Sequence, residues 1–146
     1  MTFEGINQQF KIKTTGCETK VREALGLLRA GLVLRGVGDD TCSDAEIAMA
    51  EALNNVAEHA YAGRDPGPVE IAVKVDDGGV EFVLSDWGKS MHKSQLPKGN
   101  LPDLDVARDD MPEGGFGWFM LYNLTESLSY SRNEDENRLT LFFSHS

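Results

Sequence analysis

One stretch of the sequence places three chemically capable side chains at helical spacing. Glu51, Asn55 and His59 stand four residues apart in the segment EALNNVAEHAY. In an α-helix such residues lie on one face, with about 5–6 Å between neighbouring Cβ atoms. Apolar residues such as Leu53 and Val56 cover much of the remaining surface. A carboxylate, an amide and an imidazole in line can mark a chemical site, but from this stretch alone a solvated stripe on an amphipathic helix is favoured.

Two other stretches carry residues suited to a nucleotide. The run 113–117 reads EGGFG and precedes an apolar, helical segment. The backbone N–H groups and the positive end of that helix dipole could hold phosphate oxygens. Asp86, at the end of a predicted strand, could accept a hydrogen bond from an adenine amino group, while Gly88 leaves room for the ring. Singly, each has an ordinary explanation as a turn, and the glycine run is neither a Walker A motif nor GxGxxG.

Hydrophobic periodicity predicts the elements that hold these residues. The second helix, capped by Thr41 or by Ser43 with Glu46, carries the polar stripe and ends near Gly63. The irregular connection 89–112 leaves room for a short helix over 103–110. The other predicted elements are a strand over 6–14, a helix from Glu18 to the glycine-rich 35–38, a hairpin over 69–75 and 80–85, a helix over 118–124, and a hairpin over 128–132 and 138–143.

This order predicts an α+β fold. The elements fit a two-layer sandwich, in which a mixed, mostly antiparallel sheet carries three helices on one face. Their order is strand, helix, helix, hairpin, connection, helix and hairpin. At 146 residues without an internal repeat or linker, the chain is expected to form a single domain over 1–146.

Composition excludes several classes of partner. The net charge of −10 argues against non-specific binding to nucleic acid or to an anionic membrane. The two cysteines, Cys17 and Cys42, have neither metal-ligand spacing nor an obvious disulfide role, so free thiols in a reducing compartment are expected. Without a leader or a membrane-spanning apolar run, the protein is expected to be cytoplasmic.

Taken together and in order, these stretches resemble the Bergerat-type ATP-binding fold of histidine kinases and DNA gyrase. More closely, they resemble the anti-sigma-factor serine/threonine protein kinases of bacterial partner-switching systems, from about Glu18 to Phe143. The segment 51–61 is similar to the family's N-box, Asp86-x-Gly88 to its first glycine box, and 113–117 to its second. The loop between the last two strands lacks the family's usual glycine.

The resemblance implies a role for each matched residue. Glu51 would take the proton from the attacking hydroxyl, and Asn55 would bind Mg²⁺ through its amide oxygen. Asp86 would read adenine. The remaining expected ATP-binding residues are His59 near the phosphates, Gly88, the phosphate-wrapping run of Gly114, Gly115, Phe116 and Gly117, and Thr140 as a support for the adenine-binding aspartate.

The implied function is that of an ATP- and Mg²⁺-dependent protein kinase in bacterial transcription regulation. It would phosphorylate an anti-anti-sigma antagonist protein and sequester a sigma factor, without direct contact to nucleic acid or membrane. A homodimer is expected, with the first helix and Arg22 as candidate contacts for a second copy or the sigma factor. The alternative is an ATP-binding partner-switch module with little or no kinase turnover. Retention of Glu51 favours the kinase.

Overall fold

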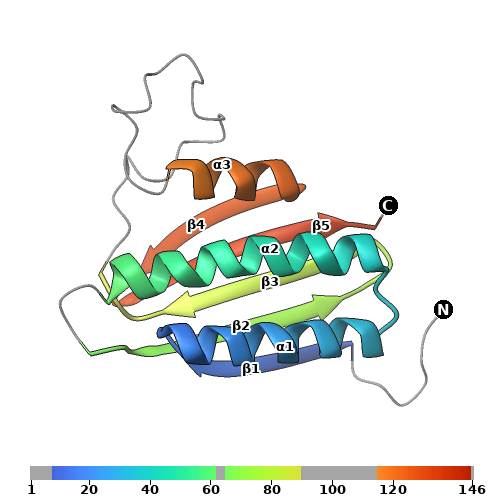
Figure 1. The fold of residues 1–146 in the computed structure, drawn as a ribbon. Coiled ribbons are helices and arrows are strands. Elements are labelled where there is room, and N and C mark those ends of the chain that lie inside the picture. Colours follow the sequence, from blue (N-terminus) through green and yellow to red (C-terminus); the bar gives the residue numbers. More distant parts are fainter. Residues whose placement is uncertain (1–7, 62–64, 90–114, 146) are drawn as a thin grey trace.

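The computed structural model describes residues 8–61, 65–89 and 115–145. They form one antiparallel sheet and a layer of helices (Figure 1). The elements are β1 (Gln9–Thr15), α1 (Glu18–Leu34), α2 (Asp39–Asn55), β2 (Pro68–Val75), β3 (Gly79–Asp86), α3 (Gly115–Leu124), β4 (Ser127–Asn133) and β5 (Glu136–Ser144). A π-helical segment, Val56–Ala60, continues α2.

The sheet has five strands in the order β1-β2-β3-β5-β4. Every pairing between these strands is antiparallel, so the expected mixed sheet is antiparallel throughout its described part. The central strand β3 pairs with β2 on one side and with β5 on the other. In this register Asp86 lies opposite both Val69 and Asn137.

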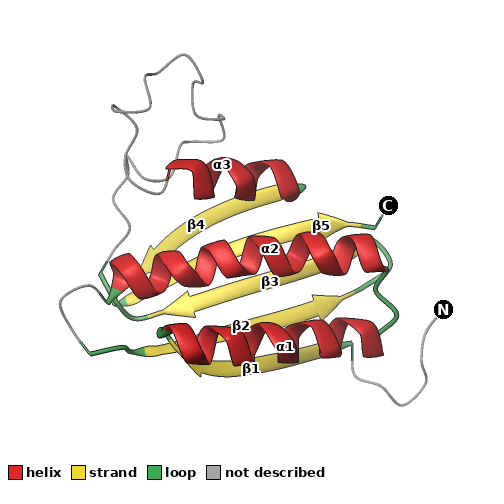
Figure 2. Cartoon of the chain, in the orientation of Figure 1, coloured by secondary structure: helices red, strands yellow, loops and turns green. Residues whose placement is uncertain are grey.

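The helices cover one face of the sheet (Figure 2). Alternate strand residues point toward them, as in β2, where Val69, Ile71, Val73 and Val75 are buried. The largest fully buried side chains come from both layers: Phe82, Leu28, Leu32, Met49, Leu53, Ile71, Leu84, Leu121 and Leu141. The predicted two-layer α+β architecture is therefore confirmed.

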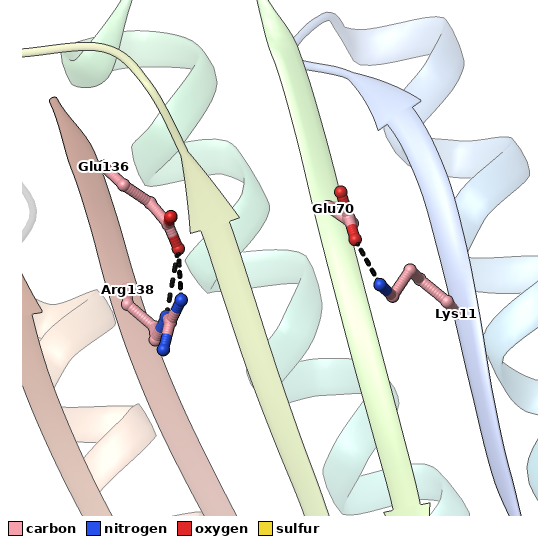
Figure 3. A network of polar contacts seen from close by, with 4 residues as sticks. All are labelled: Lys11, Glu70, Glu136 and Arg138. Carbon is pink, nitrogen blue, oxygen red and sulfur yellow. Dashed lines mark hydrogen bonds and ion pairs between the residues drawn. The ribbon is translucent and has the colours of Figure 1, made fainter.

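The opposite face of the sheet carries ion pairs (Figure 3). Lys11 Nζ lies 2.8 Å from a Glu70 carboxylate oxygen across β1 and β2. Within β5, Arg138 Nη2 lies 2.8 Å from Glu136. These side chains alternate with the buried ones, because successive strand residues point to opposite faces.

Helix α2 begins earlier than the predicted caps. Gly38 is its N-cap, no side chain caps it, and Asp39 and Asp40 in the first turn complement the positive end of the helix dipole. The predicted caps, Thr41 and Ser43, are inside the helix, and Glu46 is engaged elsewhere: Arg29 of α1 donates to it at 2.9 Å. An ion pair between α1 and α2 thus takes the residue that a capping box would need.

The end of α2 and the start of α3 also differ from the prediction. The α-helical pattern stops at Asn55, and the Tyr61 N–H donates to the Val56 carbonyl at 3.4 Å, five residues back. Helix α3 begins at Gly115 instead of residue 118. The possible short helix over 103–110 lies outside the described residues. Within the described part of the chain, no helix has both the length and the apolar content to cross a bilayer.

Candidate functional site

Three of the predicted segments lie at one end of the sheet (Figure 1). The end of α2, the end of β3 and the start of α3 lie at the same end of the molecule (Figure 1). A direct contact joins the first two, because Lys89 N–H donates to the Ala60 carbonyl at 2.7 Å. Gly115 and Gly117 form the first turn of α3, while Gly114 lies outside the described residues. Phe116 also belongs to that turn, and its side chain is outside the described part.

Asp86 is a buried carboxylate held by one of its two oxygens. Only 5% of the residue is exposed. Its Oδ1 accepts hydrogen bonds from Gly88 N–H at 2.9 Å and from Asn137 Nδ2 at 2.8 Å. Within the described residues, Oδ2 accepts none. Burial raises the pKa of Asp86 above its usual value, and the bonds from Asn137 and Gly88 oppose that rise. The free oxygen suits a ligand that donates a hydrogen bond.

Asn137, which the sequence interpretation missed, holds Asp86 in place. It is 4% exposed, and its amide Nδ2 also donates to the Lys89 carbonyl at 2.8 Å. Its Oδ1 accepts from Tyr130 Oη at 2.6 Å and from Arg132 Nη1 at 2.8 Å. A signal for Asn137 exists in the sequence, since strand alternation with Leu139, Leu141 and Phe143 puts this polar residue on the buried face.

The register corrects the role expected for Thr140. Thr140 pairs with Val83, and Asp86 pairs with Asn137. Paired residues share a face of the sheet, and residues three apart on a strand point to opposite faces. Thr140 therefore points away from the helices and from Asp86, so it cannot support that carboxylate. Asn137, three residues earlier, does so instead.

Gly88 is required by the protein's own backbone. A Cβ on this residue would lie 2.2 Å from the Ala60 carbonyl oxygen and 2.5 Å from its carbon. The expected reason for a glycine here was room for an adenine ring. The structure adds an internal cause, the close approach of the π-helical segment to the end of β3.

Tyr61 fixes the same corner from the other side. Its hydroxyl donates to the Pro68 carbonyl at 2.6 Å and accepts from Trp87 N–H at 3.0 Å. The ring is buried, and a Cβ on Gly67 would lie 2.3 Å from it. This side chain therefore ties the end of the π-helical segment to the start of β2 and to the residue after Asp86.

The polar stripe on α2 is only partly retained. Glu51 and Asn55 are half-buried and lie one turn apart in regular α-helix. His59 belongs to the π-helical segment, whose wider turn breaks the four-residue spacing, and its side chain is outside the described part. The Asn55 Nδ2 atom is buried and has no hydrogen-bond partner in the described part of the chain. Buried amides are normally satisfied, so this one has capacity left for a polar ligand.

These features fit a magnesium nucleotide. Asn55 offers an unpaired Nδ2 donor that suits a phosphate oxygen, and Asp86 offers a fixed acceptor at the same end of the sheet. The first turn of α3 has backbone N–H groups that lack helical partners, which suit phosphate oxygens. Mg²⁺ takes hard oxygen ligands and keeps several waters, so one protein oxygen together with phosphates suffices.

The fold and this site define a histidine kinase-like ATPase domain. The model of that family matches residues 16–143, and the chain belongs to it. The resemblance found in the sequence is thereby confirmed.

Two named relatives are similar to this chain in sequence. A serine-protein kinase RsbW of Bacillus pumilus (strain SAFR-032) is 30% identical over 121 residues, which cover 76% of this chain and 73% of the relative. An anti-sigma F factor of Clostridium botulinum (strain Eklund 17B / Type B) is 30% identical over 89 residues, covering 61% and 60% respectively.

Solved structures share the fold. The RsbU and RsbW domains of a Mycobacterium tuberculosis protein match with a TM-score of 0.66 at 19% identity, covering 94% of this chain and 32% of that one. A blue-light activated histidine kinase domain from Erythrobacter litoralis matches with a TM-score of 0.54 at 16% identity, covering 86% and 61%.

Proposed function

We propose that this protein is an ATP-dependent serine/threonine protein kinase and anti-sigma regulatory factor. It phosphorylates an anti-anti-sigma antagonist protein and sequesters a sigma factor. Family membership and similarity to proteins named serine-protein kinase RsbW and anti-sigma F factor support this proposal. In this proposal residues 1–146 act as one ATPase domain in the cytoplasm.

The observation that carries the proposal is the buried carboxylate of Asp86. One of its oxygens is held by two donors, and the other accepts no hydrogen bond from the residues that the structure describes. Such an arrangement suits the amino group of adenine, because a charged acceptor in a dry, fixed geometry forms a strong hydrogen bond. When bound, MgATP supplies the phosphoryl group that is transferred.

Each site residue of the chain has its own role in this proposal. Asp86 accepts a hydrogen bond from adenine, and Asn55 holds the metal through its amide oxygen. Backbone groups of Gly115 and Gly117 bind phosphate at the start of α3. Glu51, one turn before Asn55, accepts the proton of the attacking serine or threonine hydroxyl. Phosphate contacts from Gly114, Phe116 and His59 belong to the same proposal.

We also propose a homodimer formed through α1. Leu27 and Leu34, two helical turns apart, are 60% and 57% exposed, and Val33 near them is 54% exposed. Exposed apolar side chains gathered on one helix favour a protein contact. Arg22, at the N-terminal half of α1, stays a candidate contact for the second copy or for the sigma factor.

Substitution of Glu51 and Asn55 separates catalysis from binding. Glu51→Gln keeps shape and hydrogen bonding but cannot accept the proton, so we expect phosphate transfer to fall by about 10²–10⁴-fold with MgATP affinity retained. Asn55→Ala removes the metal ligand, so we expect weaker MgATP binding. Transfer of label from γ-labelled ATP to the antagonist protein measures the first effect, and the nucleotide-induced rise in melting temperature measures the second.

The two variants also decide between the kinase and the alternative. If wild-type protein binds MgATP but transfers no label, the chain is the partner-holding module with little turnover. If Glu51→Gln transfers phosphate at the parent rate, Glu51 is not the base. Glu81→Gln, an exposed carboxylate on the open face of β3, is the matched control and should leave both readings unchanged.

A further inference from the structure

A chain of hydrogen bonds leads from Arg132 through Asn137 to Asp86, and each of its members has a defined role as donor or acceptor. Arginine only donates hydrogen bonds, so the bond from Arg132 Nη1 to Asn137 at 2.8 Å identifies the accepting end of that amide as Oδ1. The opposite end, Nδ2, must then face Asp86 and the Lys89 carbonyl, each 2.8 Å away. Arg132 therefore reinforces the orientation that the acceptors on the other side of the amide also favour, with Nδ2 toward the carboxylate.

The same guanidinium acts on the second donor to Asp86. Arg132 Nη1 also donates to the Gly88 carbonyl at 3.0 Å. The Gly88 N–H in turn donates to Asp86 Oδ1 at 2.9 Å. Both groups that hold Oδ1 are thus tied to one side chain of β4. Arg132 itself is exposed, so its contribution to the core is small.

We propose that Arg132 and Asn137 are positioning residues that set the preference for adenine, by fixing Oδ1 of Asp86 so that Oδ2 faces the amino group of the base. This inference rests on the proposed ATP-binding function. Its physical basis is that a hydrogen bond weakens steeply when donor and acceptor are misaligned. A carboxylate free to rotate would spend only part of its time in the productive orientation.

A nucleotide without the amino group measures the preference directly. Purine riboside triphosphate matches ATP except for that group, so the ratio of its dissociation constant to that of ATP reports the bond to Oδ2. A hydrogen bond to a charged group corresponds to a ratio on the order of 10–100. We expect Arg132→Ala and Asn137→Ala to reduce the ratio by roughly three- to ten-fold, with Arg132→Lys recovering part of it because one donor returns.

Arg138→Ala is the matched control. Arg138 lies on the same hairpin but on the opposite face, where it bonds to Glu136 at 2.8 Å, so its loss should leave the ratio unchanged. A thermal melt of each variant establishes that it folds. If Asn137→Ala does not fold, Arg132→Ala carries the test alone, because it alters an exposed side chain.

Asp86→Asn distinguishes a failure of adenine recognition by Asp86 from a failure of the positioning role of Arg132 and Asn137. Its amide oxygen would accept from Gly88 and Asn137, which turns its NH₂ group toward the adenine amino group and removes the preference. If wild-type protein shows no preference, or if Asp86→Asn retains it, the proposed reading of adenine by Asp86 is wrong. If both behave as expected while Arg132→Ala and Asn137→Ala keep the full ratio, the positioning role is wrong.

Discussion

Ionisation of Asp86 opposes folding, because burial raises the pKa of this carboxyl above its usual value. A raised pKa in the folded state means that the folded protein holds the proton more tightly than the unfolded chain. The stability that the group contributes is full below the unfolded pKa of about 3.9 and is lost as the pH rises through the folded pKa. At neutral pH the charged side chain therefore lowers the free energy of unfolding.

Asp86→Asn tests whether the charge on Asp86 lowers the free energy of unfolding. The amide keeps an oxygen for the two donors and carries no charge, so we expect the variant to be at least as stable as the parent at neutral pH. The difference between them should move in favour of the parent as the pH falls and Asp86 takes up its proton. Urea unfolding across the acidic to neutral range measures this. A variant that is clearly less stable at neutral pH would contradict it.

The individual site residues differ in how far sequence could find them. Glu51, Asn55 and Asp86 could be proposed from the sequence because their spacing is local to one helix or one strand end. Asn137 was not, since its bond to Asp86 spans 51 positions and depends on the register of β3 against β5. The residue predicted to support Asp86, Thr140, lies three positions after Asn137. An odd displacement along a strand moves a side chain to the other face of the sheet.

At the scale of elements, the close packing of the π-helical segment on the end of β3 makes Gly88 sensitive to any side chain. In Gly88→Ala the added methyl group would meet the Ala60 backbone at 2.2 Å, which cannot move aside as a flexible side chain would. We expect a loss of about 1–3 kcal/mol in the free energy of unfolding, as for other overpacked sites. MgATP affinity should fall as well, because Asp86 receives a bond from Gly88.

Gly26→Ala is the control for this substitution. Gly26 lies in the exposed part of α1, and a Cβ there would have no atom within 4 Å. Alanine favours the helix by about 0.8–1 kcal/mol over glycine, so stability should rise instead of fall. Denaturant unfolding of both variants compares the signs, and a Gly88→Ala protein as stable as the parent would show that the contact can relax.

Elements whose signal is local matched the structure best. Four of the five strands were predicted with ends within two residues of those observed, because alternation persists along each of them. The first, predicted over 6–14, is Gln9–Thr15, and residues 6 and 7 lie outside the described part. The start of α2 was misplaced because its N-cap is Gly38, which has no side chain to mark it. Glu46 pairs with Arg29 of another helix, a contact that sequence spacing does not reveal. The π-helical segment follows Asn55 without a proline or glycine that would have indicated it.

At the scale of the whole molecule, the exposed apolar side chains of α1 predict self-association. Leu27→Glu with Leu34→Glu places charges where two copies would bury leucines, so we expect the double variant to be monomeric. Ile47 of α2 is 46% exposed, and Ile47→Glu is the control for an added charge elsewhere on the helix layer. Light scattering across a range of concentrations measures the mass. A wild-type protein that stays monomeric at high concentration would contradict the dimer.

The hairpin of β4 and β5 has a consequence for how relatives of this protein diverge. Tyr130, Arg132 and Asn137 lie within one short, continuous stretch that turns at Glu134 and Asp135, while the carboxylate they orient is encoded far upstream. Exchange of that stretch alone between two genes would change the side chains that hold Asp86 while Asp86 itself stays the same. If the proposed positioning role holds, such an exchange should change the preference for a base without any change to Asp86.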